Sequence, residues 1–309
     1  MVISGVYKDY ETIDYMIGKC DGIGYFTIES INQFELLDTL TKKYNKKINV
    51  LIRLTSGNQF GVSKEDFEYI LEKTINSNIC VEGIEFFSGT QKHSLKRISK
   101  EIDNLIEFVN YLEEKYKINL KEVEYGPGFP VFYFKDEEFD EDEFLNEANN
   151  TIDKINYKKI SIELGRSIAA SCGHFLTSVV DMKTNKNGNF TLLDGGIHQV
   201  VYYGQTMAMR IPYIDVVKKG KREKECEKYN LYGSLCTIND ILVKGIELEK
   251  LEIGDTLVFN NVGAYSSTEG ISLFLSRDLP KVVIIDKNNN LKLVRDTIYT
   301  SKVNCPYYR

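Results

Sequence analysis

The 309-residue sequence contains no tryptophan, only three histidines and five prolines, and no apolar run long enough to span a bilayer. Its start lacks the basic and then apolar pattern of a secretory signal peptide. The six cysteines include no Cys-x-x-Cys pair and no histidine at a ligand-like spacing, which argues against disulfides and against a zinc site. A formal net charge of −6 is unlike that of nucleic-acid-binding domains. We therefore expect a cytoplasmic protein with reduced thiols and with no metal, nucleic-acid or membrane partner.

Residues 1–166 alternate short strand-like runs with helical periods. The strand-like runs are rich in Val, Ile and Phe and occupy 2–5, 24–30, 48–55, 81–87, 121–128 and 159–165. Between them, Ser30 and Ser63 stand where helix N-caps are expected, and an apolar stripe at helical spacing runs from Ile98 to Leu112. This alternation predicts parallel strands that are buried on both faces.

Polar residues and glycines follow these strands, as at Ser4-Gly5, Glu29-Ser30 and Glu163 to Arg166. In a (β/α) barrel the C-terminal ends of all strands form one face, and functional sites are built on that face. A closed barrel of this type has eight strands, whereas six are recognisable here, and the first begins at residue 2. We expect residues 1–166 to form an incomplete (β/α)8 TIM-type barrel.

From residue 167 the pattern becomes mostly β. Strand patterns at 177–183, 190–196, 256–261 and 281–287 are separated by Gly and Asn turns, and residues 185–190 are typical of a hairpin. The predicted fold class is therefore α/β plus β, with domains at 1–166 and 167–309. The acidic run at 135–143 and the basic run at 218–224 are interpreted as solvated loops or helix starts rather than as binding surfaces.

Three successive strand ends carry groups that suit an anion. The Gly-Pro-Gly sequence at 126–128 lets backbone N–H groups approach a phosphate, although the same tripeptide is also an ordinary turn. The Ser-Gly-Thr-Gln sequence at 88–91 adds a hydroxyl group, and Arg166 adds a guanidinium. Arg166 could equally be the cationic partner that a buried Glu163 requires. The three elements together favour a phosphorylated cofactor.

Six motifs occur in a distinctive order: GIEFFSGTQ, YGPGFP, ELGRS, LDGG, YGSLCTIND and GAY. In this order they resemble the fold-type III pyridoxal-phosphate decarboxylases of ornithine, arginine and diaminopimelate, over essentially the whole chain. The motifs SGTQ, GPG, LDGGIH, GQ, LCT and FLS are most similar to a subgroup, like the butirosin-pathway decarboxylase, that acts on amino acids tethered to a carrier protein. The resemblance implies an alanine racemase-like barrel, pyridoxal 5′-phosphate as cofactor, and decarboxylation of a small-molecule or carrier-tethered amino acid. It also implies a homodimer, with the β domain contributing to the dimer interface and to the active site.

The resemblance further implies residue roles. Glu163 matches the acid that holds the pyridine nitrogen and favours the pyridinium, which is the electron sink for loss of CO₂. Cys236 matches a catalytic thiol that is contributed across the dimer interface and reprotonates the carbanion. The positions around the cofactor are Arg166, Gly165, Gly126, Gly128, Thr90, Tyr265, Phe87 and Arg53, and the positions near the substrate are Thr237, Asp240 and His198.

Three substitutions depart from the family pattern. Phe87 stands where a histidine usually stacks on the cofactor ring, so that an aromatic ring is kept but the imidazole proton is lost. Thr237 replaces an acid that reads a distal ammonium, which favours an acylated or tethered substrate over ornithine and diaminopimelate. Gln59 replaces a lysine that pairs across the dimer with the aspartate matching Asp240, so we expect Asp240 to lack that partner.

No lysine of this sequence matches the family's Schiff-base lysine, which lies on the first barrel strand; Lys8 lies just past a later strand. We expect the missing strands upstream of Met1 or on another polypeptide, and we expect this chain alone to be inactive. The alternative hypothesis is a catalytically dead homologue that acts as a binding or regulatory subunit. A racemase on the same barrel is a more distant alternative.

Overall fold

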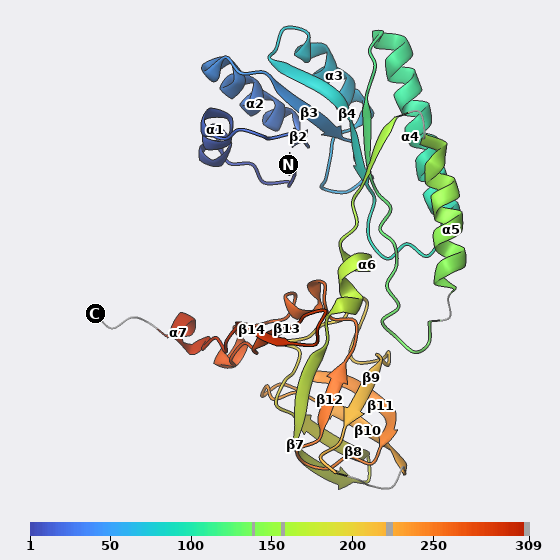
Figure 1. Ribbon diagram of the computed structural model, residues 1–309, viewed down its shortest axis with the longest axis vertical. Helices are drawn as coiled ribbons and strands as arrows, with labels where there is room; N and C mark the ends of the chain where they lie inside the picture. The colour runs from blue at the N-terminus through green and yellow to red at the C-terminus, as the bar shows by residue number, and fades with distance from the viewer. Residues whose placement is uncertain (138–139, 156–157, 221–224, 306–309) are drawn as a thin grey trace. The chain divides into compact units, whose positions relative to one another are not determined.

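The computed structural model describes residues 1–309 apart from 138–139, 156–157, 221–224 and 306–309 (Figure 1). The chain folds into two compact units. Unit 1 comprises Met1–Pro130 and Asp140–Leu164, and unit 2 comprises Val131–Phe139 and Gly165–Arg309. The chain therefore enters unit 2 once and returns to unit 1 before its final crossing at Leu164.

Unit 1 is built on a curled sheet of six parallel strands that lie side by side in sequence order. The strands are β1 (Val2–Ile3), β2 (Tyr25–Ile28), β3 (Ile48–Arg53), β4 (Ile79–Phe87), β5 (Glu122–Gly126) and β6 (Lys159–Ile162). Both Leu51 and Ile52 of β3 are completely buried although they point to opposite faces, as expected for parallel strands that are covered on both sides. The predicted partial barrel is confirmed, with each of the six strand-like runs forming a strand.

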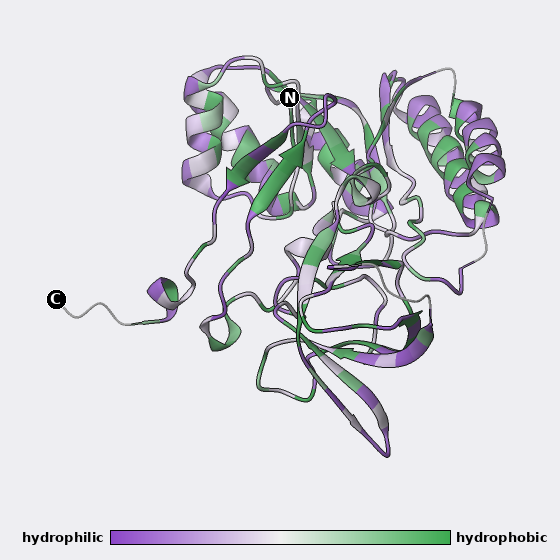
Figure 2. Ribbon diagram, turned by 60° about the horizontal axis from the view of Figure 1, so that its bottom comes forward, coloured by the Kyte–Doolittle hydropathy of each residue, from purple (hydrophilic) through white to green (hydrophobic). Residues whose placement is uncertain are grey.

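The helices of unit 1 follow the predicted pattern. They are α1 (Tyr10–Lys19), α2 (Ile31–Tyr44), α3 (Lys64–Thr74), α4 (Leu95–Tyr116) and α5 (Glu141–Ile152), with a 3₁₀ turn η1 (Asp153–Ile155). Ser30 and Ser63 are the N-caps of α2 and α3, and the apolar stripe of α4 is buried from Ile98 to Leu112. Figure 2 shows these helices with hydrophobic and hydrophilic stretches in alternation, as amphipathic helices on a sheet require. Asp140 caps α5, so the part of the acidic run that the structure describes includes a helix start; residues 138–139 lie outside the described residues.

Unit 2 contains a six-stranded sheet in the order β11-β10-β8-β7-β12-β9. Its strands are β7 (Phe175–Asn185), β8 (Gly188–Leu193), β9 (Ile214–Val217), β10 (Cys226–Tyr232), β11 (Ile241–Glu249) and β12 (Thr256–Phe259), followed by the hairpin β13 (Val282–Ile285) and β14 (Leu291–Arg295). Its short helical segments are α6 (Arg166–Ala169), η2 (Ala170–Cys172), η3 (Tyr265–Ser267), η4 (Phe274–Ser276) and α7 (Ser301–Asn304). Strands β8 and β10 pair in parallel, and the other neighbours pair antiparallel. The predicted hairpin at 185–190 is confirmed, because Asn185 pairs with Gly188 at the end of β7 and β8.

The four strand patterns predicted after residue 167 correspond to β7, β8, β12 and β13, whereas β9, β10, β11 and β14 were not predicted. The core of this sheet includes Tyr229, Leu231, Leu257 and Phe259, which are almost completely buried. Part of the predicted basic loop, residues 221–224, lies outside the described residues.

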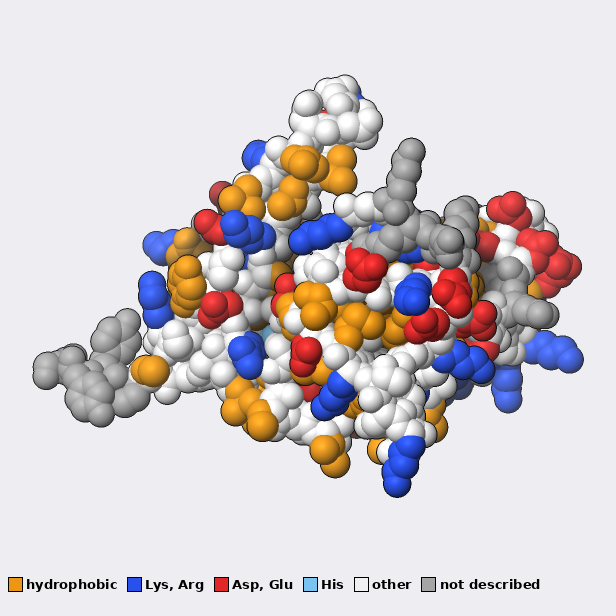
Figure 3. Space-filling model, turned by 90° about the horizontal axis from the view of Figure 1, so that it is seen from below, with side chains coloured by type: hydrophobic (Ala, Val, Ile, Leu, Met, Phe, Trp, Pro, Cys, Tyr) orange, Lys and Arg blue, Asp and Glu red, His pale blue; other side chains and the backbone are white. Residues whose placement is uncertain are grey.

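The surface carries exposed hydrophobic side chains scattered among acidic and basic ones on the face in Figure 3. Single exposed apolar residues are ordinary on protein surfaces. Among the helices that the structure describes, none is both long enough and apolar enough to cross a membrane.

Candidate active site

A row of charged side chains crosses one face of the curled sheet in unit 1. The strand register places Arg53 of β3 beside Glu85 of β4, and Glu85 beside Glu124 of β5. Neighbours in register on a parallel sheet point to the same face. Two residues further toward the C-terminal ends, Phe87 pairs with Gly126 on that face. The tertiary structure therefore brings together groups that lie more than 70 residues apart in the sequence.

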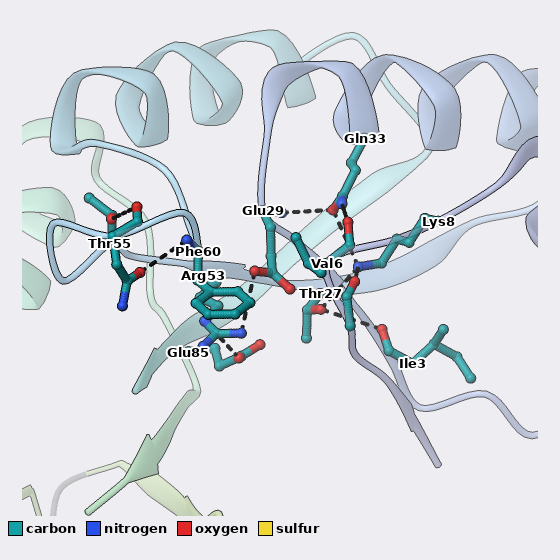
Figure 4. A network of polar contacts seen from close by, with 12 residues as sticks. Ile3, Val6, Lys8, Thr27, Glu29, Gln33, Arg53, Thr55, Phe60 and Glu85 are labelled. Atoms are coloured by element: carbon teal, nitrogen blue, oxygen red, sulfur yellow. Dashed lines mark hydrogen bonds and ion pairs between the residues drawn. The ribbon is translucent and has the colours of Figure 1, made fainter. Parts of the chain in front are cut away.

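The guanidinium of Arg53 is the cation of this row, and Figure 4 shows how its neighbours converge on it. Its Nη1 lies 3.3 Å from Glu29 Oε2, and its Nε lies 3.3 Å from Glu85 Oε1. The guanidinium also lies 4.8 Å from the centroid of the Phe60 ring. Both glutamates are buried, and the Arg53 side chain is 12% exposed. These contacts fix Arg53 on the face of the sheet that also carries Glu85 and Phe87.

Lys8 lies close to the same group, in the loop after β1 (Figure 4). Its Nζ donates to the Gly5 carbonyl at 2.6 Å, to Gln33 Oε1 at 3.2 Å and to Thr27 Oγ1 at 3.4 Å. Burial lowers the pKa of Lys8, although the charges of Glu29 and Glu85 oppose this shift. The sequence did not mark Lys8 as a site residue, because only the fold brings it near these acids.

Glu163 lies beside Glu124, because its backbone N–H donates to the Tyr125 carbonyl at 3.0 Å. Burial raises the pKa of Glu124 to about 8, and a hydrogen bond and charge repulsion from Glu163 act in the same direction. Burial likewise raises the pKa of Glu85 to about 7, with the charge of Glu163 as the next cause. Two carboxyl groups in contact cannot both ionise without strong repulsion. Glu124 is therefore protonated at neutral pH and donates a hydrogen bond to Glu163.

The acids of unit 1 also keep unused acceptor atoms. Among the described residues, Glu29 Oε1, Glu85 Oε2 and Glu124 Oε2 are buried and have no hydrogen-bond partner. A buried polar atom without a partner costs about 1–3 kcal/mol, and such atoms are frequent where a ligand binds. This end of unit 1 is thus suited to a ligand that supplies donors.

The two glycine-containing loops of unit 1 approach one another so closely that side chains would not fit. A Cβ on Gly126 would lie 2.3 Å from Phe87 Cδ2, and a Cβ on Gly128 would lie 2.0 Å from the Gly89 carbonyl oxygen. Gly128 also has a φ of +61°, which favours glycine. The loop that holds Thr90 therefore lies directly against the Gly-Pro-Gly loop, so the structure brings Phe87, Thr90, Gly126 and Gly128 together.

Arg166 begins the short helix α6 in unit 2 and is 8% exposed. Its guanidinium lies 4.8 Å from the ring centroids of both Tyr203 and Tyr265, and its Nη1 donates to Tyr133 Oη at 3.2 Å. Its Nε is buried and has no partner among the described residues. A Cβ on Gly165 would meet Tyr265 Oη at 2.9 Å. Gly165, Arg166 and Tyr265 thus form one compact group with an unused donor.

Cys236 is exposed, in a loop of unit 2 that is organised by Asp240. The Asp240 carboxylate accepts from the backbone N–H of Leu235 at 2.7 Å and from that of Ile197 at 2.8 Å. Asp240 is 1% exposed, and a Cβ on Gly233 would lie 2.3 Å from its carboxylate oxygens. Asp240 therefore holds the loop that presents Cys236, a structural task that the sequence did not reveal.

The two other predicted substrate positions lie in the same region of unit 2. Thr237 follows Cys236, and its Oγ1 accepts from the Asn239 N–H at 3.3 Å. His198 is 2% exposed, and its Nδ1 has no partner among the described residues. Burial lowers the pKa of His198, so its imidazole is neutral at pH 7. A neutral imidazole can accept or donate one hydrogen bond.

Among the groups that were missed in the sequence are Glu85, Glu124 and two of the tyrosines around Arg166. A period-two reading of β4 and β5 could have placed the two glutamates on the face of Phe87 and Gly126. Tyr133 and Tyr203 lie in irregular segments, where no periodicity marks them.

These arrangements can be compared with known proteins. The family model described as "Pyridoxal-dependent decarboxylase, C-terminal sheet domain" matches residues 6–263. The chain belongs to the pyridoxal-dependent decarboxylases. This confirms the resemblance seen in the motifs, and the cofactor of the family is pyridoxal phosphate.

Individual relatives agree with this assignment. An L-glutamyl-[BtrI acyl-carrier protein] decarboxylase of Niallia circulans is 26% identical, over 96% of this chain and 74% of the relative. A diaminopimelate decarboxylase of Methanocaldococcus jannaschii is 27% identical, over 93% of this chain and 69% of the relative. The crystal structure of diaminopimelate decarboxylase from M. jannaschii in co-complex with L-lysine aligns with a TM-score of 0.83 at 24% identity, covering 98% of this chain and 73% of that chain. The predicted fold class is thereby confirmed.

The residues present fit a pyridoxal phosphate molecule on independent structural grounds. Unit 1 offers buried Glu124 beside half-buried Glu163 at the strand ends, and a loop contact that excludes side chains. Unit 2, taken by itself, offers a buried guanidinium nitrogen that has no partner among the described residues. These are the features that a pyridine nitrogen and a phosphate require.

Proposed function

We propose that this chain supplies cofactor-binding and proton-donating residues for the decarboxylation of an amino acid, or of an aminoacyl group tethered to a carrier protein, with pyridoxal phosphate as cofactor. It does not turn over substrate alone in this proposal, because no lysine in its sequence matches the family's Schiff-base position. The observation that carries this proposal is buried Glu124 paired with half-buried Glu163, beside Phe87 and the glycine loop, on one set of strand ends in unit 1.

When bound, the cofactor supplies an electron sink for the electrons that remain on Cα after CO₂ departs. Glu163 faces the ring nitrogen in this proposal and stabilises its protonated form by charge. Glu124 donates its proton to Glu163 and so orients that carboxylate. Phe87 packs against the ring face, a contact in which an aromatic ring suffices.

Each unit, taken by itself, carries groups that match the family's phosphate-binding positions. In unit 1 these are Thr90, Gly126 and Gly128, whose close loop contact leaves room only for backbone. In unit 2 these are Gly165, Arg166 and Tyr265, where the unused Arg166 Nε is available for a charged oxygen.

Cys236 is proposed as the acid that returns a proton to Cα, and its exposure leaves the thiol accessible. Thr237 beside it offers no charge to a distal ammonium, which favours a substrate whose distal end is acylated or tethered. One relative acts on a glutamyl group attached to an acyl-carrier protein, in agreement with this choice. A homodimer in which Cys236 serves the partner's site remains part of the proposal.

The test is a titration of the purified protein with pyridoxal phosphate, followed by absorbance and fluorescence. We expect saturable binding, and we expect Glu163→Gln to weaken it about 10- to 100-fold, because a charge-assisted hydrogen bond is worth about 1.5–3 kcal/mol. The matched control is Glu122→Gln. Glu122 is a buried glutamate of the same sheet, but it is paired with Lys159 at 2.8 Å near the start of β5. Its replacement should leave cofactor affinity unchanged. Absence of binding by the wild-type protein would favour the regulatory alternative, and equal affinities of wild type and Glu163→Gln would refute the role of Glu163.

A further inference from the structure

A buried lysine lies behind the proposed phosphate loops and has no part in the mechanism above. Lys92 follows the Ser-Gly-Thr-Gln sequence, and its side chain is only 1% exposed. Its Nζ lies 2.7 Å from Glu101 Oε2, an acid on α4. Burial lowers the pKa of Lys92, but the hydrogen bond and the charge of Glu101 act in the opposite direction. The ion pair keeps both groups charged inside unit 1.

Glu101 connects several parts of unit 1. Besides Lys92, its carboxylate accepts from Ser88 Oγ at 2.5 Å, from Tyr125 Oη at 2.7 Å and from Arg97 Nε at 3.2 Å. Ser88 begins the loop that carries Thr90, and Tyr125 immediately precedes Gly126. One carboxylate thereby holds residues next to both glycine-containing loops.

Lys92 itself bonds to both glycines of the Gly-Pro-Gly loop. Its Nζ donates to the Gly126 carbonyl at 3.3 Å, and its backbone N–H donates to the Gly128 carbonyl at 2.9 Å. In a planar trans peptide the N–H points opposite to the C=O. Because the Gly128 carbonyl turns toward Lys92, the following N–H of Phe129 turns away from it. The Gly128 peptide is thus held by the backbone of residue 92, whereas the orientation of the Gly126 carbonyl depends on the Lys92 side chain.

We propose that Lys92 and Glu101 are a positioning pair that fixes the two loops of unit 1 for a phosphate monoester. This inference rests on the proposed function, because it deepens the phosphate assignment of Thr90, Gly126 and Gly128. The pair does not touch the ligand. It holds the donor groups in one arrangement, so binding of the phosphate does not carry the entropic cost of ordering them.

The same helix offers a matched control. Lys158 is 7% exposed in its side chain, and its Nζ lies 2.5 Å from Glu113 of α4. Glu113 lies 12 residues after Glu101, which is about 18 Å along a helix. Lys158 directly precedes β6, so it lies at the N-terminal end of a strand and away from the phosphate loops. Both ion pairs contribute to stability, but only the Lys92–Glu101 pair contacts the phosphate loops.

The experiment compares Lys92→Met with Lys158→Met in three binding titrations, against pyridoxal phosphate, inorganic phosphate and unphosphorylated pyridoxal. We expect both variants to melt below wild type. We expect only Lys92→Met to bind pyridoxal phosphate and inorganic phosphate at least tenfold more weakly, with pyridoxal affinity unchanged. A purely structural role would lower all three affinities together, or none of them.

A double variant keeps the test decisive if Lys92→Met folds poorly. Lys92→Met combined with Glu101→Gln removes both charges, so no unpaired ion stays buried and folding should recover. Phosphate affinity should remain low in the recovered protein. Wild-type affinity for phosphate in either Lys92 variant overturns the inference, as does an equal loss in Lys158→Met. Failure of wild type to bind pyridoxal phosphate would overturn the proposed function and this inference together, whereas wild-type binding with an unaltered Lys92→Met overturns this inference alone.

Discussion

Buried acids of the two units differ in how fully the protein satisfies them. In unit 2, Asp240 accepts two backbone N–H groups, and Asp255 accepts the Glu252 N–H at 2.8 Å and the Lys219 N–H at 3.3 Å. In unit 1, Glu85 and Glu124 each keep a buried oxygen without a partner among the described residues. The buried acids Asp240 and Asp255 of unit 2 are satisfied by the protein itself, whereas Glu85 and Glu124 of unit 1 are only partly satisfied.

This difference distinguishes structural carboxylates from those available for chemistry. A carboxylate that accepts backbone N–H groups is stabilised in its charged form and fixes a loop. A carboxyl group that is buried among other acids has a raised pKa and carries a proton, as Glu124 does. Such perturbed acids cluster at functional sites, which agrees with the assignment of unit 1 to the cofactor ring.

The largest expected effect on stability concerns Asp240, the carboxylate of unit 2 that fixes a loop. Asp240→Ala leaves the N–H groups of Leu235 and Ile197 without their acceptor, and each buried unsatisfied donor costs about 1–3 kcal/mol. We expect the free energy of unfolding to fall by about 2–5 kcal/mol, measured by urea denaturation. Asp240→Asn keeps one carbonyl acceptor, so it should lose about half as much. A loss below about 1 kcal/mol in the alanine variant would show that Asp240 does not hold this loop.

For Glu124 we expect an effect of intermediate size on the free energy of unfolding, and ionisation of this carboxyl group lowers stability instead of raising it. Its pKa is about 8 in the folded protein and 4.5 ordinarily, so the folded state binds more protons than the unfolded state between these values. The free energy of unfolding therefore falls as pH rises from 4.5 to 8. Glu85, with a pKa of about 7, adds to this decline between 4.5 and 7.

Glu124→Gln removes this ionisation while keeping a polar side chain of the same size. We expect the melting temperature to rise by about 2–4 °C at pH 8, the shift that 1 kcal/mol gives in a chain of this size, and to be unchanged at pH 5. Glu122→Gln is the control, for which we expect a change in stability of the opposite sign. Burial works to raise the pKa of Glu122, but hydrogen bonds from Lys159 and Ser161 outweigh it and lower the pKa. Its replacement should destabilise the protein above pH 5. Equal behaviour of the two variants would contradict the distinction between paired and excess acids.

The smallest effect is expected at Cys236. Its side chain is exposed and its loop is held by Asp240, so Cys236→Ser should change the free energy of unfolding by less than about 0.5 kcal/mol. The measurement is again urea denaturation, with Asp240→Ala as the contrasting variant in the same loop. A large loss of stability in Cys236→Ser would indicate a packing role for the thiol.

Much of unit 1 could be predicted from sequence because its signals are local. Short apolar runs alternate with amphipathic periods, and serine caps mark the helix starts at Ser30 and Ser63. In unit 2 only half of the strands were predicted. Strand β10, for example, contains Glu227, Lys228 and Asn230 and is stabilised by pairing with β8, which is distant in sequence, and with the following strand β11.

The candidate site was predicted in the same uneven way. Glycines and the Glu163–Arg166 element could be recognised because each stands at a strand end, and ordered motifs then indicated the family. Sequence reasoning could not predict the protonation of Glu124 or the hydrogen bonds that Asp240 accepts from backbone N–H groups. Nor could it predict the hydrogen-bond network around Glu101. Each depends on which side chains meet across strands and helices.

The sequence by itself therefore determined the order of strands and helices in unit 1, the family and the residue types at the strand ends, because these follow from local periodicity and from motif order. Only the tertiary structure decided which carboxylates are satisfied and which are left with a proton. Burial and the nearest charges set the pKa of a carboxyl group, and in this protein those neighbours come from strands and helices far apart in the chain.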